Sequence, residues 1–171
     1  FIGILVLIAL VLIVALFVKK EYTIEREVTI AKPKQEVFDY IKLLKNQANY
    51  SVWVKKDPNA KMEYKGTDGT VGFVSSWDGN SDVGKGEQEI KKITEGERID
   101  LGLHFIEPME GVADAYFATT AIDSSQTKVK WSFHNKVKYP FNVICLFMNM
   151  DKMIGNDLAG GLTNLKTVLE K

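Results

Sequence analysis

Residues 127–169, TKVKWSFHNKVKYPFNVICLFMNMDKMIGNDLAGGLTNLKTVL, decide the fold because their hydrophobic period changes within one stretch. In the first part, Val129, Trp131 and Phe133 alternate with polar residues, which is typical of a strand with one buried face. From Val143 to Leu169, apolar residues recur every three or four positions and predict a long amphipathic helix. The stretch therefore predicts a helix that packs against a sheet.

Three glycines, Gly155, Gly160 and Gly161, interrupt the predicted helix. In a helix interior each glycine costs up to ~1 kcal/mol relative to alanine. Such a cost predicts a bend, or a close approach of the helix backbone to the sheet or to a ligand.

The chain upstream supplies the rest of the sheet. Residues 21–30 alternate as a strand whose apolar face is broken only by Arg26, and Pro33 opens a helix. A short helical or turn segment follows. Between residues 60 and 136 the period is two, with short turns, which predicts six strands in an antiparallel meander. This order of elements defines an α+β fold.

Composition excludes several classes of function. The 171 residues carry 22 Lys and Arg against 22 Asp and Glu, so the net charge is zero. Because nucleic acid binding needs clustered cationic charge, we expect no nucleic acid partner. Cys145 is the single cysteine, which excludes an internal disulfide and a zinc site built on cysteines. We expect no metal and no cofactor.

The first 18 residues, FIGILVLIALVLIVALFV, contain no charged or polar side chain, and Lys19 and Lys20 follow directly. At about 1.5 Å per residue this run reaches roughly 27 Å, close to the ~30 Å hydrocarbon layer of a bilayer. A cleaved signal peptide and a buried helix are the alternatives, but the run has no cleavage site after Phe17 and no polar face. We expect residues 1–20, completed by residues before Phe1, to form a single transmembrane anchor.

Gly79 to Lys85 spell G-x-x-x-x-G-K, the start of a phosphate-binding loop. Gly86 stands where the loop needs a Ser or Thr for magnesium, and the following EQEIKKI has the period of a strand rather than a helix. Glycine-rich turns between strands are ordinary in hairpins. The segment therefore predicts a β-hairpin, and we expect no nucleotide partner.

Few residues qualify for catalysis. His104 and His134 fall on the polar faces of their strands, without a partner at metal spacing. Asp114 lies in an otherwise apolar strand, where an inward side chain would have a raised pKa and could act as a general base. An outward orientation is favoured, which leaves Asp114 a weak catalytic candidate.

Aromatic residues gather on one face of the predicted sheet. With the facing helix they can either fill a core completely or line an apolar cavity. A small apolar ligand needs a cavity of roughly 300–1,000 Å3 with such walls. Both interpretations stay open at this point.

Four stretches of the chain resemble the START-like superfamily, also abbreviated SRPBCC, and in particular bacterial polyketide cyclase/dehydrase-like proteins with an N-terminal hydrophobic segment. They are IAKPKQEVFDYI, SVWVKKDPNAKMEYKGTDGTVGFVSSWDGNSDVGKGEQEI, TKVKWSF and FMNMDKMIGNDLAGGLTNLK. The resemblance covers residues 21–171 as one domain. It implies a helix-grip fold, in which a curved antiparallel sheet wraps around a long C-terminal helix with a cavity between them.

The resemblance also implies where a ligand would bind. In members that bind ligands, the inward sheet residues and the long helix form the walls, and the superfamily has no universal catalytic residue. The ligand-binding candidates implied in this chain are Trp53, Tyr64, Phe73, Trp77, Leu103, Phe105, Phe117, Trp131, Phe133, Phe147 and Met150.

Two functions fit these features. The first is a membrane-anchored binding module for a small hydrophobic ligand such as a lipid, quinone or polyketide-like molecule. The second is an accessory subunit of a larger membrane protein complex, with a filled or non-functional cavity; an enzyme of the cyclase or hydrolase type is a third. We expect a single-pass location in a bacterial inner membrane. Lys19 and Lys20 favour a cytoplasmic domain, and charge before Phe1 would decide the side.

Overall fold

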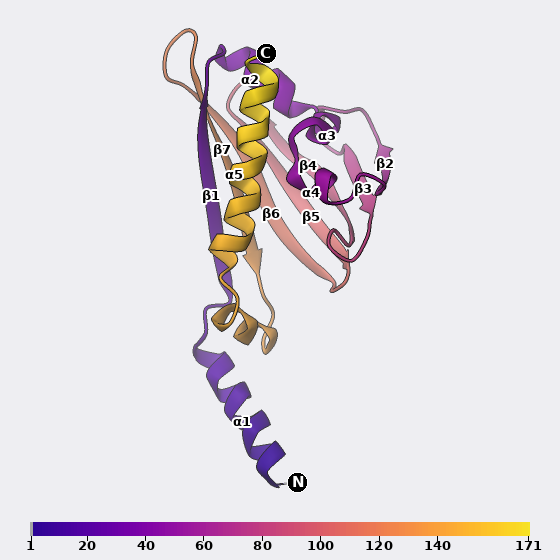
Figure 1. Ribbon diagram of the computed structural model, residues 1–171, viewed down its shortest axis with the longest axis vertical. Helices are drawn as coiled ribbons and strands as arrows, with labels where there is room; N and C mark the ends of the chain where they lie inside the picture. Colours follow the sequence, from indigo (N-terminus) through magenta and orange to yellow (C-terminus); the bar gives the residue numbers. More distant parts are fainter. Residues whose placement is uncertain (1) are drawn as a thin grey trace.

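The computed structural model describes residues 2–171, in which a seven-stranded sheet curves around one long C-terminal helix (Figure 1). The helices are α1 (Ile2–Phe17), α2 (Lys34–Lys42), α3 (Gln47–Tyr50), α4 (Val52–Lys56) and α5 (Met150–Leu169), with 3-10 helices η1 (Leu44–Asn46) and η2 (Phe141–Leu146). The strands are β1 (Glu21–Ile30), β2 (Lys61–Lys65), β3 (Val74–Asp78), β4 (Lys85–Thr94), β5 (Arg98–Glu107), β6 (Gly111–Ala121) and β7 (Thr127–Lys136). This order confirms the predicted α+β succession of elements.

The sheet has the strand order β1-β7-β6-β5-β4-β3-β2, and all neighbouring strands are antiparallel. Strands β2 to β7 form the predicted meander, and β1 joins it at the far edge through β7. Inward residues of neighbouring strands lie opposite one another, as Phe117 of β6 does with Trp131 of β7. The inward faces therefore form one continuous and mainly apolar surface toward α5.

The long C-terminal helix is shorter than the predicted apolar stripe. Helix α5 begins at Met150 and not at Val143, because the residues before it form the separate 3-10 helix η2. The side chain of Asn149 accepts a hydrogen bond from the backbone N–H of Lys152 at 2.9 Å and caps the helix there. The buried leucines of α5 are Leu158, Leu162, Leu165 and Leu169.

Two of the three helix glycines lie where α5 touches the sheet. A Cβ at Gly155 would overlap the guanidinium of Arg26, and a Cβ at Gly161 would lie 2.7 Å from Cζ3 of Trp131. Arg26, the polar exception on the inner face of β1, also donates two hydrogen bonds to the Asp151 carboxylate, at 3.0 and 3.1 Å. The predicted close approach of the helix backbone to the sheet is confirmed at these two positions.

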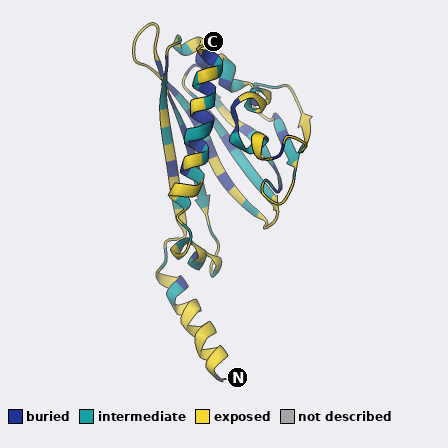
Figure 2. Cartoon of the chain, in the orientation of Figure 1, coloured by how far each residue is buried: buried dark blue, intermediate teal, exposed yellow. Residues whose placement is uncertain are grey.

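One end of the space between the sheet and α5 is filled by α2. Val37, Phe38 and Ile41 of α2 are fully buried there, together with Leu165 of α5 and Ile30 of β1. Figure 2 shows the buried positions of α5 near its C-terminal end, beside α2. At this end the aromatic and aliphatic side chains form a packed core.

Helix α1 leads away from the sheet (Figure 1) and covers residues 2–17 of the expected anchor. Phe1, the first residue of the expected anchor, lies outside the described residues. The helix has 16 residues. No helix within residues 2–171 is long and apolar enough to cross a membrane. The spanning segment expected at residues 1–20 stays a prediction.

In the glycine-rich segment, residues 79–84 form the turn between β3 and β4, and Lys85 begins β4. The backbone N–H of Gly79 donates to the carbonyl of Gly84 at 2.9 Å, and Lys85 pairs with Asp78 across the two strands at 2.8 Å. Gly84 has a φ of +68°, a conformation that side chains disfavour. The predicted hairpin is confirmed.

Candidate functional site

A cavity of 340 Å3 lies between the sheet and the N-terminal half of α5. Ile154 and Leu158 of α5 form one side, α4 forms another, and inward residues from β2 to β7 form the floor. Its volume falls within the roughly 300–1,000 Å3 of small-molecule sites. The sequence left open whether the inward aromatic residues fill a core or line a cavity. In this part of the interior they line a cavity.

Aromatic rings support one another along the cavity wall. The ring centroids of Trp53 and Trp131 are 5.8 Å apart at 79°, and those of Trp77 and Phe105 are 6.1 Å apart at 71°. Phe133 lies 6.5 Å from Phe105. Edge-to-face pairs of this kind stabilise beyond the area that they bury, so the wall holds its shape around an apolar space.

Trp131 separates the cavity from the packed core. Its other neighbours, Phe117 at 4.6 Å and Tyr50 at 6.2 Å, are both fully buried. Burial raises the pKa of the Tyr50 phenol, so this side chain stays neutral beside Trp131. Trp131 is thus fixed from one side and exposes the other to the cavity.

Polar groups gather where α3 and α4 meet the sheet. The side-chain amide of Gln88 on β4 donates to the Gln47 amide oxygen on α3 at 2.7 Å. The carboxylate of Asp57, at the end of α4, accepts backbone N–H groups from Asn59 at 3.1 Å and Asn80 at 2.7 Å. Asp57 therefore ties α4 to the β3–β4 hairpin, and Gln47, Gln88 and Asp57 all line the cavity.

The structure brings together six of the eleven ligand-binding candidates from the sequence. These side chains lie around the cavity and come from α4, β3, β5 and β7. They are Trp53, Trp77, Leu103, Phe105, Trp131 and Phe133. Their contact with a ligand remains a prediction.

Five candidates lie elsewhere. Phe73 and Phe117 belong to the packed core, and Tyr64 stacks on Phe73 from outside at 6.0 Å. Met150 and Phe147 lie beside η2, where Phe147 is 83% exposed. Periodicity identifies the inward face of the sheet, but not the part of that face that α2 covers. It also predicts Phe147 on the long helix, whereas this helix begins at Met150.

Sequence reasoning missed the polar end of the cavity. Gln88 gave a signal, since it is a polar residue on the inward side of a predicted strand. Asp57 lies where a short helical segment ends and Asp82 lies in the glycine-rich turn, positions at which an aspartate is ordinary. These residues approach one another through tertiary packing that no local pattern contains.

Asp114 and the two histidines face away from the cavity. Asp114 is exposed while its neighbour Ala115 is buried and lines the cavity. On the same outer face, Nδ1 of His134 lies 2.8 Å from the hydroxyl of Thr23. Within residues 2–171, no cluster of three or more His, Cys, Asp and Glu side chains is placed to hold a metal. The outward orientation that the sequence favoured for Asp114 removes it from the site.

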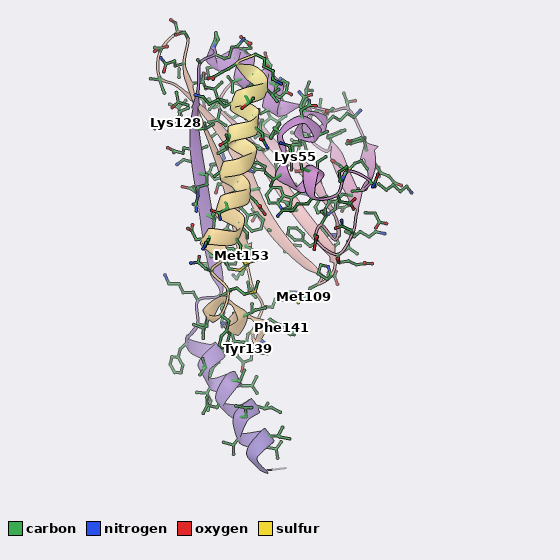
Figure 3. The ribbon with its side chains drawn as sticks, in the orientation of Figure 1. Lys55, Met109, Lys128, Tyr139, Phe141 and Met153 are labelled. Carbon is green, nitrogen blue, oxygen red and sulfur yellow. The ribbon has the colours of Figure 1, made fainter. Side chains whose placement is uncertain are left out.

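A second, open groove lies where α1 meets η2. The side-chain amide of the buried Asn142 donates to the carbonyls of Ala15 at 2.7 Å and Val18 at 3.0 Å, which ties the end of α1 to η2. Figure 3 shows Tyr139 and Phe141 at this junction, and both are exposed. The groove is apolar but lies outside the sheet–helix interior.

No protein-family model and no curated protein matches the sequence, whereas solved structures do. Ara h 8.0201 is 18% identical with a TM-score of 0.57, over 87% of this chain and 97% of that one. Norcoclaurine synthase from Thalictrum flavum is 12% identical with a TM-score of 0.60, over 86% and 96%. The di-domain ARO/CYC StfQ of the steffimycin biosynthetic pathway is 10% identical with a TM-score of 0.64, over 88% and 51%.

These likenesses define the class of fold. The chain has a helix-grip fold, the architecture that the sequence resemblance implied. At such low identities the likeness covers the fold alone, because one fold hosts many activities. Function must therefore be argued from the cavity of this chain.

Proposed function

We propose that this domain binds a small hydrophobic molecule, such as a lipid, quinone or polyketide-like compound, in the cavity between the sheet and α5. One observation carries the proposal: the 340 Å3 space is lined mainly by apolar and aromatic side chains. A filled interior was the alternative, and it would leave no room for a ligand. Burying apolar ligand surface contributes about 25 cal/mol per Å2, so such walls favour apolar molecules.

Extraction of bound material tests this proposal. The full chain is purified, extracted with organic solvent and analysed by mass spectrometry. The matched control is Ala115→Leu, which adds a larger side chain at a position that lines the cavity. We expect a lipophilic compound in near-stoichiometric amount with the wild type and a strongly reduced amount with the variant. Equal amounts from both proteins would overturn the assignment of the ligand to this cavity.

We also propose that α1 holds the domain at a membrane. Every residue from Ile4 to Ile13 is apolar and exposed, so apolar side chains lie on all sides of this part of α1. A protein partner covers one side of a helix, whereas hydrocarbon covers every side, so lipid is favoured over a subunit of a complex. Lys19 and Lys20 follow the helix and suit the anionic surface of a membrane.

Vesicle flotation tests this location. The wild-type chain is compared with Val6→Asp and with the control Val71→Asp, since these valines are 58% and 60% exposed on α1 and on the domain. A carboxylate within hydrocarbon is costly, so we expect Val6→Asp to weaken flotation and Val71→Asp to leave it unchanged. Wild-type protein that stays with the unbound fraction would contradict the location.

A further inference from the structure

The cavity carries negative charge at its polar end. Among the residues that line it, the charged ones are Asp57 and Asp82, and no described lining residue is a lysine, arginine or histidine. Asp57 is only 9% exposed, whereas Asp82 lies at the surface of the β3–β4 turn. The cavity therefore has one inner and one outer carboxylate.

Asp57 is held in place by neutral donors. Its carboxylate oxygens accept the backbone N–H groups of Asn59 and Asn80 at 3.1 and 2.7 Å. Within residues 2–171, no cationic side chain lies within ion-pair distance of Asp57 or Asp82. Backbone donors stabilise the carboxylate without cancelling its charge, so its field extends into the cavity.

Two lysines near this end along the chain are already paired. Lys56, which precedes Asp57, lies 2.7 Å from the Asp157 carboxylate. Lys85, at the end of the β3–β4 turn, lies 2.8 Å from Asp78. Each pair is locally neutral, so these lysines leave the net negative charge of the cavity end in place.

From these contacts we infer that the cavity selects uncharged apolar molecules and rejects anionic ones. An anionic headgroup would lose its hydration beside a carboxylate and would find no cation to replace it. An uncharged donor such as a hydroxyl or amine N–H can instead bond to Asp57 or to the Gln47–Gln88 amides. This inference rests on the proposed ligand binding and names its class: neutral molecules with a hydrogen-bond donor, rather than fatty acids or phospholipids.

We call this preference for neutral over anionic ligands the charge rule. Two fluorescent probes that share one ring system test it. N-phenyl-1-naphthylamine is neutral, and 8-anilinonaphthalene-1-sulfonate adds a sulfonate to the same rings and N–H. Both are titrated against the full chain at fixed salt, and only the signal that Ala115→Leu removes is assigned to the cavity. We expect the sulfonate to bind at least about tenfold more weakly than the neutral probe.

Charge variants show whether the carboxylates cause this preference. Asp57→Asn removes the inner charge, and Asp82→Lys places a cation at the exposed end without touching a buried contact. The control Glu97→Lys makes the same charge change on the exposed β4–β5 turn. We expect the affinity for the neutral probe, divided by the affinity for the sulfonate, to fall at least threefold with Asp82→Lys. Folded Asp57→Asn should give the same decrease. The ratio should stay constant with Glu97→Lys.

Each outcome has a distinct meaning. The charge rule is supported when the neutral probe binds more tightly than the sulfonate and Asp82→Lys reduces this difference. Sulfonate binding as tight as neutral binding overturns the rule but leaves ligand binding intact, as does an unchanged ratio in Asp82→Lys. Failure of both probes overturns the proposed function, and the rule with it.

Discussion

The two halves of the space between the sheet and α5 differ in packing, although they share the same strands and the same helix. Beside the C-terminal half of α5, residues such as Phe38, Phe117 and Leu165 are fully buried in a continuous core. Beside the N-terminal half, Leu103 and Phe105 remain partly exposed to a cavity. One helix-grip domain thus contains a solid end that provides stability and a hollow end that can hold a ligand.

The covering helices explain this difference. Helix α2 inserts three fully buried side chains into the interior, whereas none of the residues of α4 is buried. Asp57 holds the end of α4 against the β3–β4 hairpin by accepting the backbone N–H of Asn80. Helix α4 therefore bridges the hollow end without filling it.

The largest contrast is expected between Phe117→Ala and Phe105→Ala. Removing Phe117 opens a void in the packed core and should lower the free energy of unfolding by about 3–5 kcal/mol. Removing Phe105 only enlarges an existing cavity and should cost less than about half as much. Urea unfolding of both variants measures the difference, and equal losses would break the distinction between the two ends.

The second test adds volume on one strand. Ala113 and Ala115 share the buried face of β6, but only Ala115 lines the cavity. Ala113→Leu should overpack the interior and lower stability by about 1–3 kcal/mol. Ala115→Leu should leave stability unchanged within about 1 kcal/mol, because it fills empty space, while reducing binding of N-phenyl-1-naphthylamine at least about tenfold. Thermal unfolding and fluorescence titration check both, and a reversed order would show that the hollow lies elsewhere.

Two adjacent glycines of α5 give a smaller effect. A Cβ at Gly161 would press on the Trp131 ring at 2.7 Å, whereas a Cβ at Gly160 would meet a methyl of Val52 at 3.0 Å. Gly161→Ala should lower stability by about 1–2 kcal/mol, because overpacking outweighs the gain in helix propensity. Gly160→Ala should be neutral or slightly stabilising. Greater loss in Gly160→Ala during chemical unfolding would contradict this account of the helix–sheet contact.

The smallest effect concerns the pH dependence of stability that comes from the ion pair between Arg26 and Asp151. Hydrogen bonding from Arg26 lowers the pKa of Asp151. A lowered pKa in the folded state contributes stability above the ordinary aspartate pKa, and that contribution is lost as pH falls through the lowered pKa. Asp151→Asn should therefore be slightly less stable than the wild type at pH 7, and the difference should disappear in strong acid. Urea unfolding of both proteins from pH 7 to strong acid measures this difference in stability. A difference that does not change with pH would exclude the Arg26–Asp151 ion pair as its cause.

The sequence anticipated most of the fold because the fold depends on local patterns. Alternation identified the strands, and the stripe of leucines identified the helix. The glycines predicted a close approach to the sheet, whose contacts with Arg26 and Trp131 only the structure shows. The start of α5 was placed too early, because the side-chain cap of Asn149 leaves the apolar spacing unchanged. The membrane span was expected from apolar length alone.

The candidate site was only partly predictable. Trp131 and Phe133 were placed on the correct face, but nothing local distinguishes Phe105, which faces the cavity, from Phe117, which is fully buried in the core. That distinction depends on where α2 and α4 lie over the sheet. The same is true of Asp57, whose neighbours come from a hairpin more than twenty residues away.

Methyl NMR of the full chain during titration with N-phenyl-1-naphthylamine tests the central claim most directly. The account predicts shifts at Leu101, Leu103 and Ile154 around the cavity, with little change at Leu165 and Ile30 in the packed core. Shifts confined to Leu146 and Val14, in the groove between α1 and η2, would contradict it, as would the absence of any saturable shift.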